Sequence, residues 1–245
     1  TLQIGNDKDI TEYRYRGASP KNYVTFNNEV WRIIGIFPTD DGTGNIENRI
    51  KIIKDQSIGE YEWETDSSNN WTGATLNTEL NTTYLNGLND DKNMIGDAKY
   101  YLGYGGSTKD SYYKSERNSI KNIKTNSPIS WIGKIGLMYA SDYGYAITSG
   151  VCDRELDALD PDCIQHNWIY SDNNTTMWLI NPMGENSGDS FCAAIVNGGY
   201  IPSQGKVIQE VKNYSYFVVP TLYLNSLVKI IGGTGTSTDP YTFGL

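Results

Sequence analysis

The stretch MWLINPMGENSGDSFCAAIVNGGYIPSQGKVIQEVKNYSYFVVPTLYL, residues 177–224, decides how the rest of the chain is interpreted. Three apolar runs in it have the length of buried strands: Met177–Pro182, Phe191–Val196 and Tyr216–Leu224. The segments between these runs are rich in Gly, Asn, Ser, Gln and Lys. This pattern predicts a rigid sheet with exposed loops, and binding residues commonly lie on such loops.

The predicted recognition surface consists of three polar segments: Met183–Ser190, Asn197–Gln204 and Gln209–Tyr216. Aromatic side chains in binding loops give a large contact area at low entropic cost, and small polar residues add adaptable hydrogen bonds. Trp178 and Tyr200 are the candidate anchors. The predicted ligand-binding residues are Trp178, Asn181, Met183, Glu185, Asn186, Asn197, Tyr200, Gln204, Tyr214 and Tyr216.

Length and charge limit the classes of protein to which the chain can belong. Its 245 residues are enough for one large domain, and neither a repeat nor a linker divides them. We therefore expect a flexible lead-in over residues 1–12 and a single domain over residues 13–245. The net charge of −9 argues against nucleic acid as a partner, because phosphate binding requires a basic face.

The sequence also bears on location. No apolar run approaches the roughly 20 residues that span a bilayer, so we expect no membrane insertion by this segment. The chain has neither a signal peptide nor an initiator methionine. We expect a mature or trimmed bacterial protein that is extracellular or at the cell surface, anchored through a segment absent from this chain.

The N-terminal half begins with predicted strands. Tyr23–Phe26 and Glu29–Phe37 are joined at Asn27-Asn28, and asparagine tolerates the positive φ of a tight hairpin. The second of these strands is apolar on both faces, which predicts a central position in a sheet. Arg49–Lys54 is the next predicted strand.

Helix patterns follow these strands. Gly73–Leu88 carries apolar residues at i, i+4 spacing, which predicts an amphipathic helix. Asn93–Leu102 and Asp110–Ile120 are two further short helix candidates, and Ser141-Asp142 is a candidate helix start. Because helices lie between strand-rich halves, the sequence predicts an α+β fold with antiparallel sheets and two or three short helices.

A polar loop between two predicted strands is a weak calcium candidate. Asp40, Asp41, Asn45 and Glu47 supply the oxygen ligands that calcium prefers. The alternative is a plain hairpin loop with Asp-Gly turn chemistry, and it is the favoured interpretation. We therefore expect no cofactor other than this candidate calcium ion.

Three cysteines allow two interpretations. Cys152 and Cys163 flank a short polar segment, and a disulfide between them would contribute about 3 kcal/mol. Cys192 then remains as a buried thiol in an apolar strand. The alternative is a zinc site formed by Cys152, Cys163, His166 and Cys192, although structural zinc sites usually contain paired knuckles.

The sequence motifs that would indicate an enzyme are scarce in this chain. A catalytic triad would have to use His166, the single histidine, and no Gly-x-Ser-x-Gly motif is present. The glycine-rich pieces lack the Gly-Lys-Ser/Thr of a phosphate-binding loop. We therefore expect a protein without catalytic residues.

Several long pieces of the chain resemble one family of uncharacterised secreted or surface proteins from gut Firmicutes. They are YRYRGASPKNYVTFNNEVWRIIGIF, RIKIIKDQSIGEYEW, MIGDAKYYLG, IGKIGLMYASDYGYA and GGTGTSTDPY, in the family's order and nearly end to end. In that family a cysteine pair precedes a tryptophan segment, which Cys152, Cys163 and Trp168 match. The resemblance implies the Cys152–Cys163 disulfide. Val219 stands where the family usually has arginine, so no role of that arginine is transferred.

The C-terminal pattern is similar to C-type-lectin-like domains, including those of the formylglycine-generating (sulfatase-modifying) superfamily. This likeness implies a C-type-lectin-like fold whose C-terminal hairpins present a ligand-binding face. We expect an adhesin-like extracellular module that binds a carbohydrate or protein ligand on a host, phage or neighbouring cell. The alternatives are a structural pilus or surface-layer subunit and, less favoured, an enzyme of the sulfatase-modifying type that would depend on Cys192.

Overall fold

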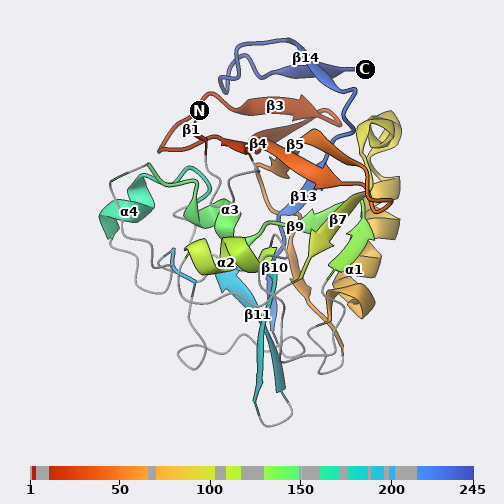
Figure 1. Ribbon diagram of the computed structural model, residues 1–245, viewed down its shortest axis with the longest axis vertical. Coiled ribbons are helices and arrows are strands. Elements are labelled where there is room, and N and C mark those ends of the chain that lie inside the picture. The colour runs from red at the N-terminus through yellow and green to blue at the C-terminus, as the bar shows by residue number, and fades with distance from the viewer. Residues whose placement is uncertain are drawn as a thin grey trace.

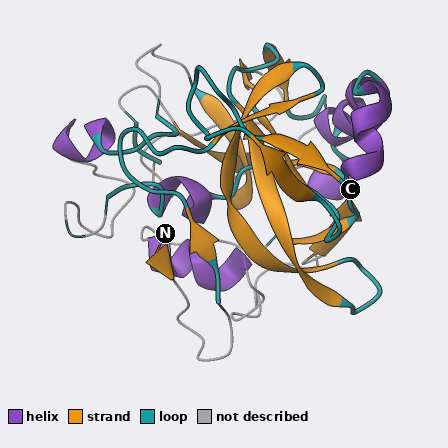
Figure 2. Ribbon diagram, turned by 90° about the horizontal axis from the view of Figure 1, so that it is seen from above, coloured by secondary structure: helices purple, strands orange, loops and turns teal. Residues whose placement is uncertain are grey.

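The computed structural model describes residues 2–3, 11–65, 70–102, 109–116, 130–148, 150, 161–170, 176–186, 189–195, 199–201 and 214–245. Several sheets, almost entirely antiparallel, and short helices make up this part of the chain, which confirms the α+β class. Figure 2 shows the strands in the middle of the molecule with helices at both sides. One hydrophobic core cluster includes residues from Val24 to Val228.

The larger sheet has seven strands in the order β1-β2-β4-β5-β13-β9, with β3 also paired to β4, and every pair is antiparallel. The predicted hairpin is confirmed, because Asn27 and Asn28 have φ of 54° and 57° between β3 and β4. The strands are β1 (Leu2–Gln3), β2 (Tyr13–Arg14), β3 (Tyr23–Phe26), β4 (Glu29–Asp40), β5 (Ile46–Lys54), β9 (Ile135–Leu137) and β13 (Pro220–Tyr223).

The second sheet has the order β11-β10-β12-β6, and its β10–β12 pair is parallel. Its strands are β6 (Glu60–Glu62), β10 (Met177–Asn186), β11 (Asp189–Ile195) and β12 (Ser215–Phe217). Two small antiparallel sheets of two strands each consist of β7 (Ala98–Tyr101) with β8 (Ser130–Gly133), and of β14 (Lys229–Gly232) with β15 (Thr242–Gly244). The β10–β11 hairpin and β14 lie at opposite ends of the molecule (Figure 1).

The helices are short. They are η1 (Trp71–Gly73), α1 (Thr75–Glu79), η2 (Leu80–Tyr84), η3 (Asn89–Met94), α2 (Lys109–Glu116), α3 (Ala140–Gly144) and α4 (Pro161–Gln165). α1 and η2 together confirm the helix expected over Gly73–Leu88, and α2 and α3 confirm two further expectations. The helix expected over Asn93–Leu102 is wrong. Buried and half-buried residues alternate along β7, so the period is that of a strand.

The apolar run Tyr216–Leu224 is divided between the two sheets. β12 ends at Phe217 and pairs with β6 and β10, whereas β13 begins at Pro220 and pairs with β5 and β9. Proline has no N–H to donate, so it suits the first position of a strand. The break at Val218-Val219 therefore lets one segment of chain join both sheets.

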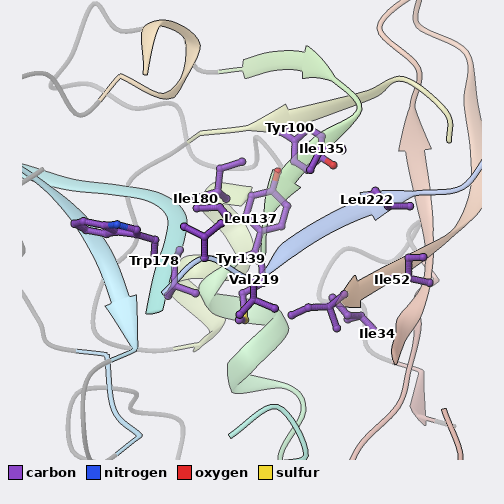
Figure 3. Packing of buried hydrophobic residues seen from close by; sticks show 14 of the residues in the cluster. Ile34, Ile52, Tyr100, Ile135, Leu137, Tyr139, Trp178, Ile180, Val219 and Leu222 are labelled. Atoms are coloured by element: carbon purple, nitrogen blue, oxygen red, sulfur yellow. The ribbon is translucent and has the colours of Figure 1, made fainter. Parts of the chain in front are cut away.

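Aromatic rings fill much of the space beneath the two sheets. Trp63 lies at the centre, 5.1 Å from Trp71 and 5.7 Å from Trp178 between ring centroids. Trp178 also makes an edge contact with Tyr216 at 4.6 Å. Figure 3 shows Ile180 of β10 beside Leu137 of β9, with Leu222 of β13, Ile52 of β5 and Ile34 of β4 further across the core.

Candidate functional site

Two of the predicted ligand-binding residues belong to the core. Trp178 is 1% exposed, and its indole N–H donates to the Tyr61 carbonyl at 2.9 Å. Asn181 is fully buried, where it accepts from the Ala140 N–H and donates to the Glu116 carboxylate, both at 2.9 Å. Both side chains pack in the interior, because strand β10 is buried on both faces from Met177 to Asn181. Their burial gives both a structural role, and their contact with a ligand stays a prediction.

The segment Met183–Ser190 is not the loop that the sequence predicts. Met183, Glu185 and Asn186 lie on strand β10, which pairs with β11 up to Asn186 and Asp189. The register shifts twice between Trp178 and Gly184, so irregular pairing replaces a loop. The polar residues of this segment therefore lie at the end of the β10–β11 hairpin.

The remaining predicted contacts are divided between described and undescribed parts. Asn197 and Gln204 lie outside the described residues. Tyr200 is half-buried, whereas Tyr214 is 51% exposed. The rings of Tyr214 and Tyr216 are stacked, with centroids 6.1 Å apart and an interplanar angle of 2°. This tyrosine pair at β12 is the part of the predicted recognition surface that the structure displays.

A pocket of about 160 Å³ lies where the two sheets meet, and we call it the inter-sheet pocket. The stretch 177–224 contributes Met177, Phe217 and Val219 to its wall, and β4, β5 and the segment directly after β5 provide most of the remainder. The full lining is Arg32, Ile53, Lys54, Asp55, Gln56, Ser57, Met138, Trp168, Ile169, Met177, Phe217 and Val219.

Arg32 is held in a fixed position at this pocket. Its Nε donates to the Asn22 side-chain oxygen at 2.8 Å, and its guanidinium lies 3.8 Å from the Tyr23 ring centroid and 4.8 Å from that of Trp168. Asp55 is its ion-pair partner at 3.5 Å. Burial lowers the pKa of Arg32 from its ordinary value, although an arginine keeps its charge at neutral pH.

Polar and apolar side chains line the pocket together. Asp55, Gln56 and Ser57 follow the end of β5, and the Gln56 amide donates to Asp55 at 3.1 Å. Phe217 and Trp168 lie among the apolar lining residues. Pockets that combine apolar walls with a few placed polar groups are typical small-ligand sites. Arg32, Asp55, Gln56 and Ser57 carry no local signal in the sequence, because their closeness to Phe217 depends on tertiary pairing.

The calcium-candidate loop is a closed hairpin turn. Asp40 accepts from the N–H groups of Gly42 and Gly44 at 2.7 and 3.1 Å, and Asp41 accepts from Thr43 at 2.8 Å. The hydrogen bond from Gly42 is the main cause of a lowered Asp40 pKa. This geometry supports the alternative interpretation as a hairpin loop, with Asn45 and Glu47 flanking the turn. A bound calcium ion stays a prediction.

The zinc and disulfide predictions involve residues that lie partly outside the described part of the chain. Within the described ranges, no three His, Cys, Asp or Glu side chains converge on a point that could hold a metal. Cys163 is buried in α4, and His166 is exposed just after it. Cys152 and the Cys192 side chain lie outside the described part. The Cys152–Cys163 disulfide and a catalytic role for Cys192 therefore stay predictions.

A group of four buried charges lies under the larger sheet, and sequence reasoning did not find it. We call Glu12, Arg14, Lys51 and Asp142 the buried charge cluster. Each is at most 2% exposed. Arg14 bonds to Glu12 and Asp142 at 3.1 and 2.9 Å, and Lys51 bonds to Asp142 at 2.5 Å. Residues far apart in the chain form it, so local patterns carry no signal for it.

Comparisons with known proteins assign the chain to no family. No family model, curated protein or solved structure matches the chain. In the part of the chain that the structure describes, none of the helices has the length and apolar character needed to cross a membrane. The site must therefore be interpreted from its own chemistry.

Proposed function

We propose that the chain is a non-catalytic binding module of the cell exterior, and that its inter-sheet pocket receives the terminal sugar of a glycan. The observation that carries this proposal is the pocket itself, which Arg32, Asp55 and Gln56 line together with apolar side chains. A sugar ring has polar edges and an apolar face, so it suits such a pocket. The resemblance to secreted surface proteins and the lectin-like C-terminal pattern point to the same class.

The tyrosine pair extends this proposal beyond the pocket. Phe217 lines the pocket, and Tyr216 and Tyr214 precede it on the same short segment. A ligand larger than one sugar would reach from the pocket to the half-buried ring of Tyr216 and the exposed ring of Tyr214. Tyr216 also contacts the buried Trp178, which fixes its orientation. Aromatic rings that the core holds in place bind with little loss of entropy.

A glycan screen of the full chain, with and without calcium, tests the proposal. Replacing Asp55 and Gln56 together by Ala removes polar groups from the pocket, and we expect about tenfold weaker binding, since one hydrogen bond to a charged group contributes about 1.5–3 kcal/mol. Isothermal titration calorimetry with the best glycan would measure this loss.

The variant Tyr214→Ala serves as the matched comparison for the pocket. Its loss should be smaller, because Tyr214 lies outside the pocket lining. Glycan binding that the Asp55/Gln56 variant retains in full would refute the pocket assignment. If the chain binds a protein and no glycan, the proposed ligand class is wrong, but the proposal of a binding module stands.

A structural subunit is the second candidate, and one observation favours it. Leu227, Ile231 and Leu245 are 70%, 69% and 74% exposed at the C-terminal β14–β15 hairpin. Apolar side chains grouped at one end of a molecule often mark a contact surface. This hairpin lies at the end of the molecule opposite the β10–β11 hairpin (Figure 1). Self-assembly through it would suit a pilus or surface-layer subunit.

A further inference from the structure

Lys51 and Asp142 meet in the interior of the protein. Lys51 lies on β5, and Asp142 lies in the first turn of α3, 91 positions further along the chain. The Lys51 Nζ is 2.5 Å from the Asp142 Oδ2, which is shorter than a normal hydrogen bond. The two side chains are 0% and 1% exposed. An amine and a carboxyl group are thus held in contact away from solvent.

Aromatic rings surround this contact. The Lys51 Nζ lies 4.4 Å from the centroid of the Tyr139 ring and 5.1 Å from that of Tyr223. Water does not solvate either group here, so transfer of a proton from the amine to the carboxyl group costs less than it would in water. Proton transfer from the ammonium to the carboxylate gives neutral groups, and these are the reactive forms for amide formation.

We propose that Lys51 and Asp142 condense to form an intramolecular isopeptide bond. The ammonium first gives a proton to Oδ2. The Nζ lone pair then attacks Cγ and forms the C–N bond, Oδ2 takes a second proton from the nitrogen, and the Cγ–Oδ2 bond breaks. One water molecule leaves, and one hydrogen stays on the amide nitrogen. Atoms and charges balance without an oxidant, a reductant or a co-reactant.

Arg14 is placed to assist this step. Its Nη1 lies 2.9 Å from Oδ1, the oxygen that carries negative charge in the tetrahedral intermediate. A fixed donor aimed at a developing oxyanion lowers the barrier of acyl transfer. Glu12 pairs with the other side of the guanidinium at 3.1 Å. After condensation, Arg14 and Glu12 still balance each other, so the interior gains no uncompensated charge.

The mass of the intact protein tests the proposal independently of ligand binding. The full chain, purified and reduced, should weigh one water molecule less than its sequence. Trypsin should leave Lys51 uncleaved, so that peptide 50–54 stays joined to peptide 135–154. Fragmentation of this branched peptide should locate the bond at Lys51 and Asp142.

Two variants make the result specific. Lys51→Arg keeps the positive charge but removes the amine, and it should restore the full mass with no branched peptide. Lys54→Arg alters a lysine of the same strand that pairs with Glu29, and it should keep the water loss.

A wild-type chain of full mass that trypsin cleaves after Lys51 would overturn the proposal. Water loss located at Asp41-Gly42 would also overturn it, because a succinimide there has the same mass. The wild-type peptide map decides the question even if Lys51→Arg fails to fold.

Discussion

At the scale of single residues, burial separates side chains that look alike in the sequence. Trp178 and Tyr214 both lie in the polar and aromatic C-terminal stretch, and both were expected at the ligand. Trp178 is 1% exposed and Tyr214 is 51% exposed. An aromatic residue in an apolar run predicts packing, whereas one among polar residues predicts exposure. The buried positions of Arg14 and Lys51 could not be predicted, because their partner Asp142 is distant in sequence.

Replacement of Trp178 should therefore affect stability. Trp178→Ala removes a ring that packs against Trp63 and Tyr216, so we expect the free energy of unfolding to fall by about 3–5 kcal/mol. Urea denaturation followed by circular dichroism would measure this change. Tyr214→Ala is the control, with a change within about 0.5 kcal/mol. Equal effects of the two variants would contradict the packing described for Trp178.

At the scale of elements, helix α1 depends on a residue outside it. Its N-cap, Ala74, offers no side-chain acceptor, and Glu64 supplies one from the segment after β6. The Glu64 carboxylate accepts from the Thr75 N–H at 2.8 Å and from the Thr75 hydroxyl at 2.6 Å. The sequence predicts this helix by its apolar spacing but does not identify its cap, since the capping carboxylate is eleven positions away.

Glu64→Ala should destabilise the protein by about 1–2 kcal/mol, since it removes a helix cap. Burial raises the pKa of Glu64, but hydrogen bonds from Thr75 and Thr65 outweigh it and leave the pKa below its ordinary 4.5. The stabilisation is therefore present above that pH and is lost as the pH falls through the lowered pKa.

Denaturation at neutral and acidic pH would measure both effects of Glu64. Glu62→Ala, at an exposed position of β6, is the control and should change the stability little. A Glu64→Ala variant as stable as the wild type at neutral pH would show that the cap contributes nothing.

At the scale of the whole molecule, the sequence predicts which segments form strands better than it predicts how they join. The β3–β4 hairpin and β5 were expected from turn residues and apolar runs, because both signals are local. The division of Tyr216–Leu224 between two sheets was not expected, because Val218-Val219 is as apolar as its neighbours. The inter-sheet pocket depends on that division, so it could not be predicted from the sequence either.

The exposed apolar hairpin gives a test at this scale. If β14–β15 is an assembly surface, sedimentation of the wild-type chain should show association that increases with concentration. Ile231→Lys should abolish it, because a charge on the contact surface opposes burial. Ile132→Lys changes a 50% exposed isoleucine on β8 and should leave the association intact. A wild-type chain that stays monomeric at all concentrations would exclude assembly through this surface.

The position of β13 has a consequence for how the protein is made. This strand comes from residues 220–223, yet it lies between β5 and the edge strand β9 of the larger sheet. While a ribosome is still adding residues beyond β9, β5 and β9 have no strand to join them. The sheet can close only after nearly all of this sequence has emerged. Nascent chains that stop before residue 220 should therefore remain open to chaperones and proteases, because β9 is not yet joined to the strands of the N-terminal half.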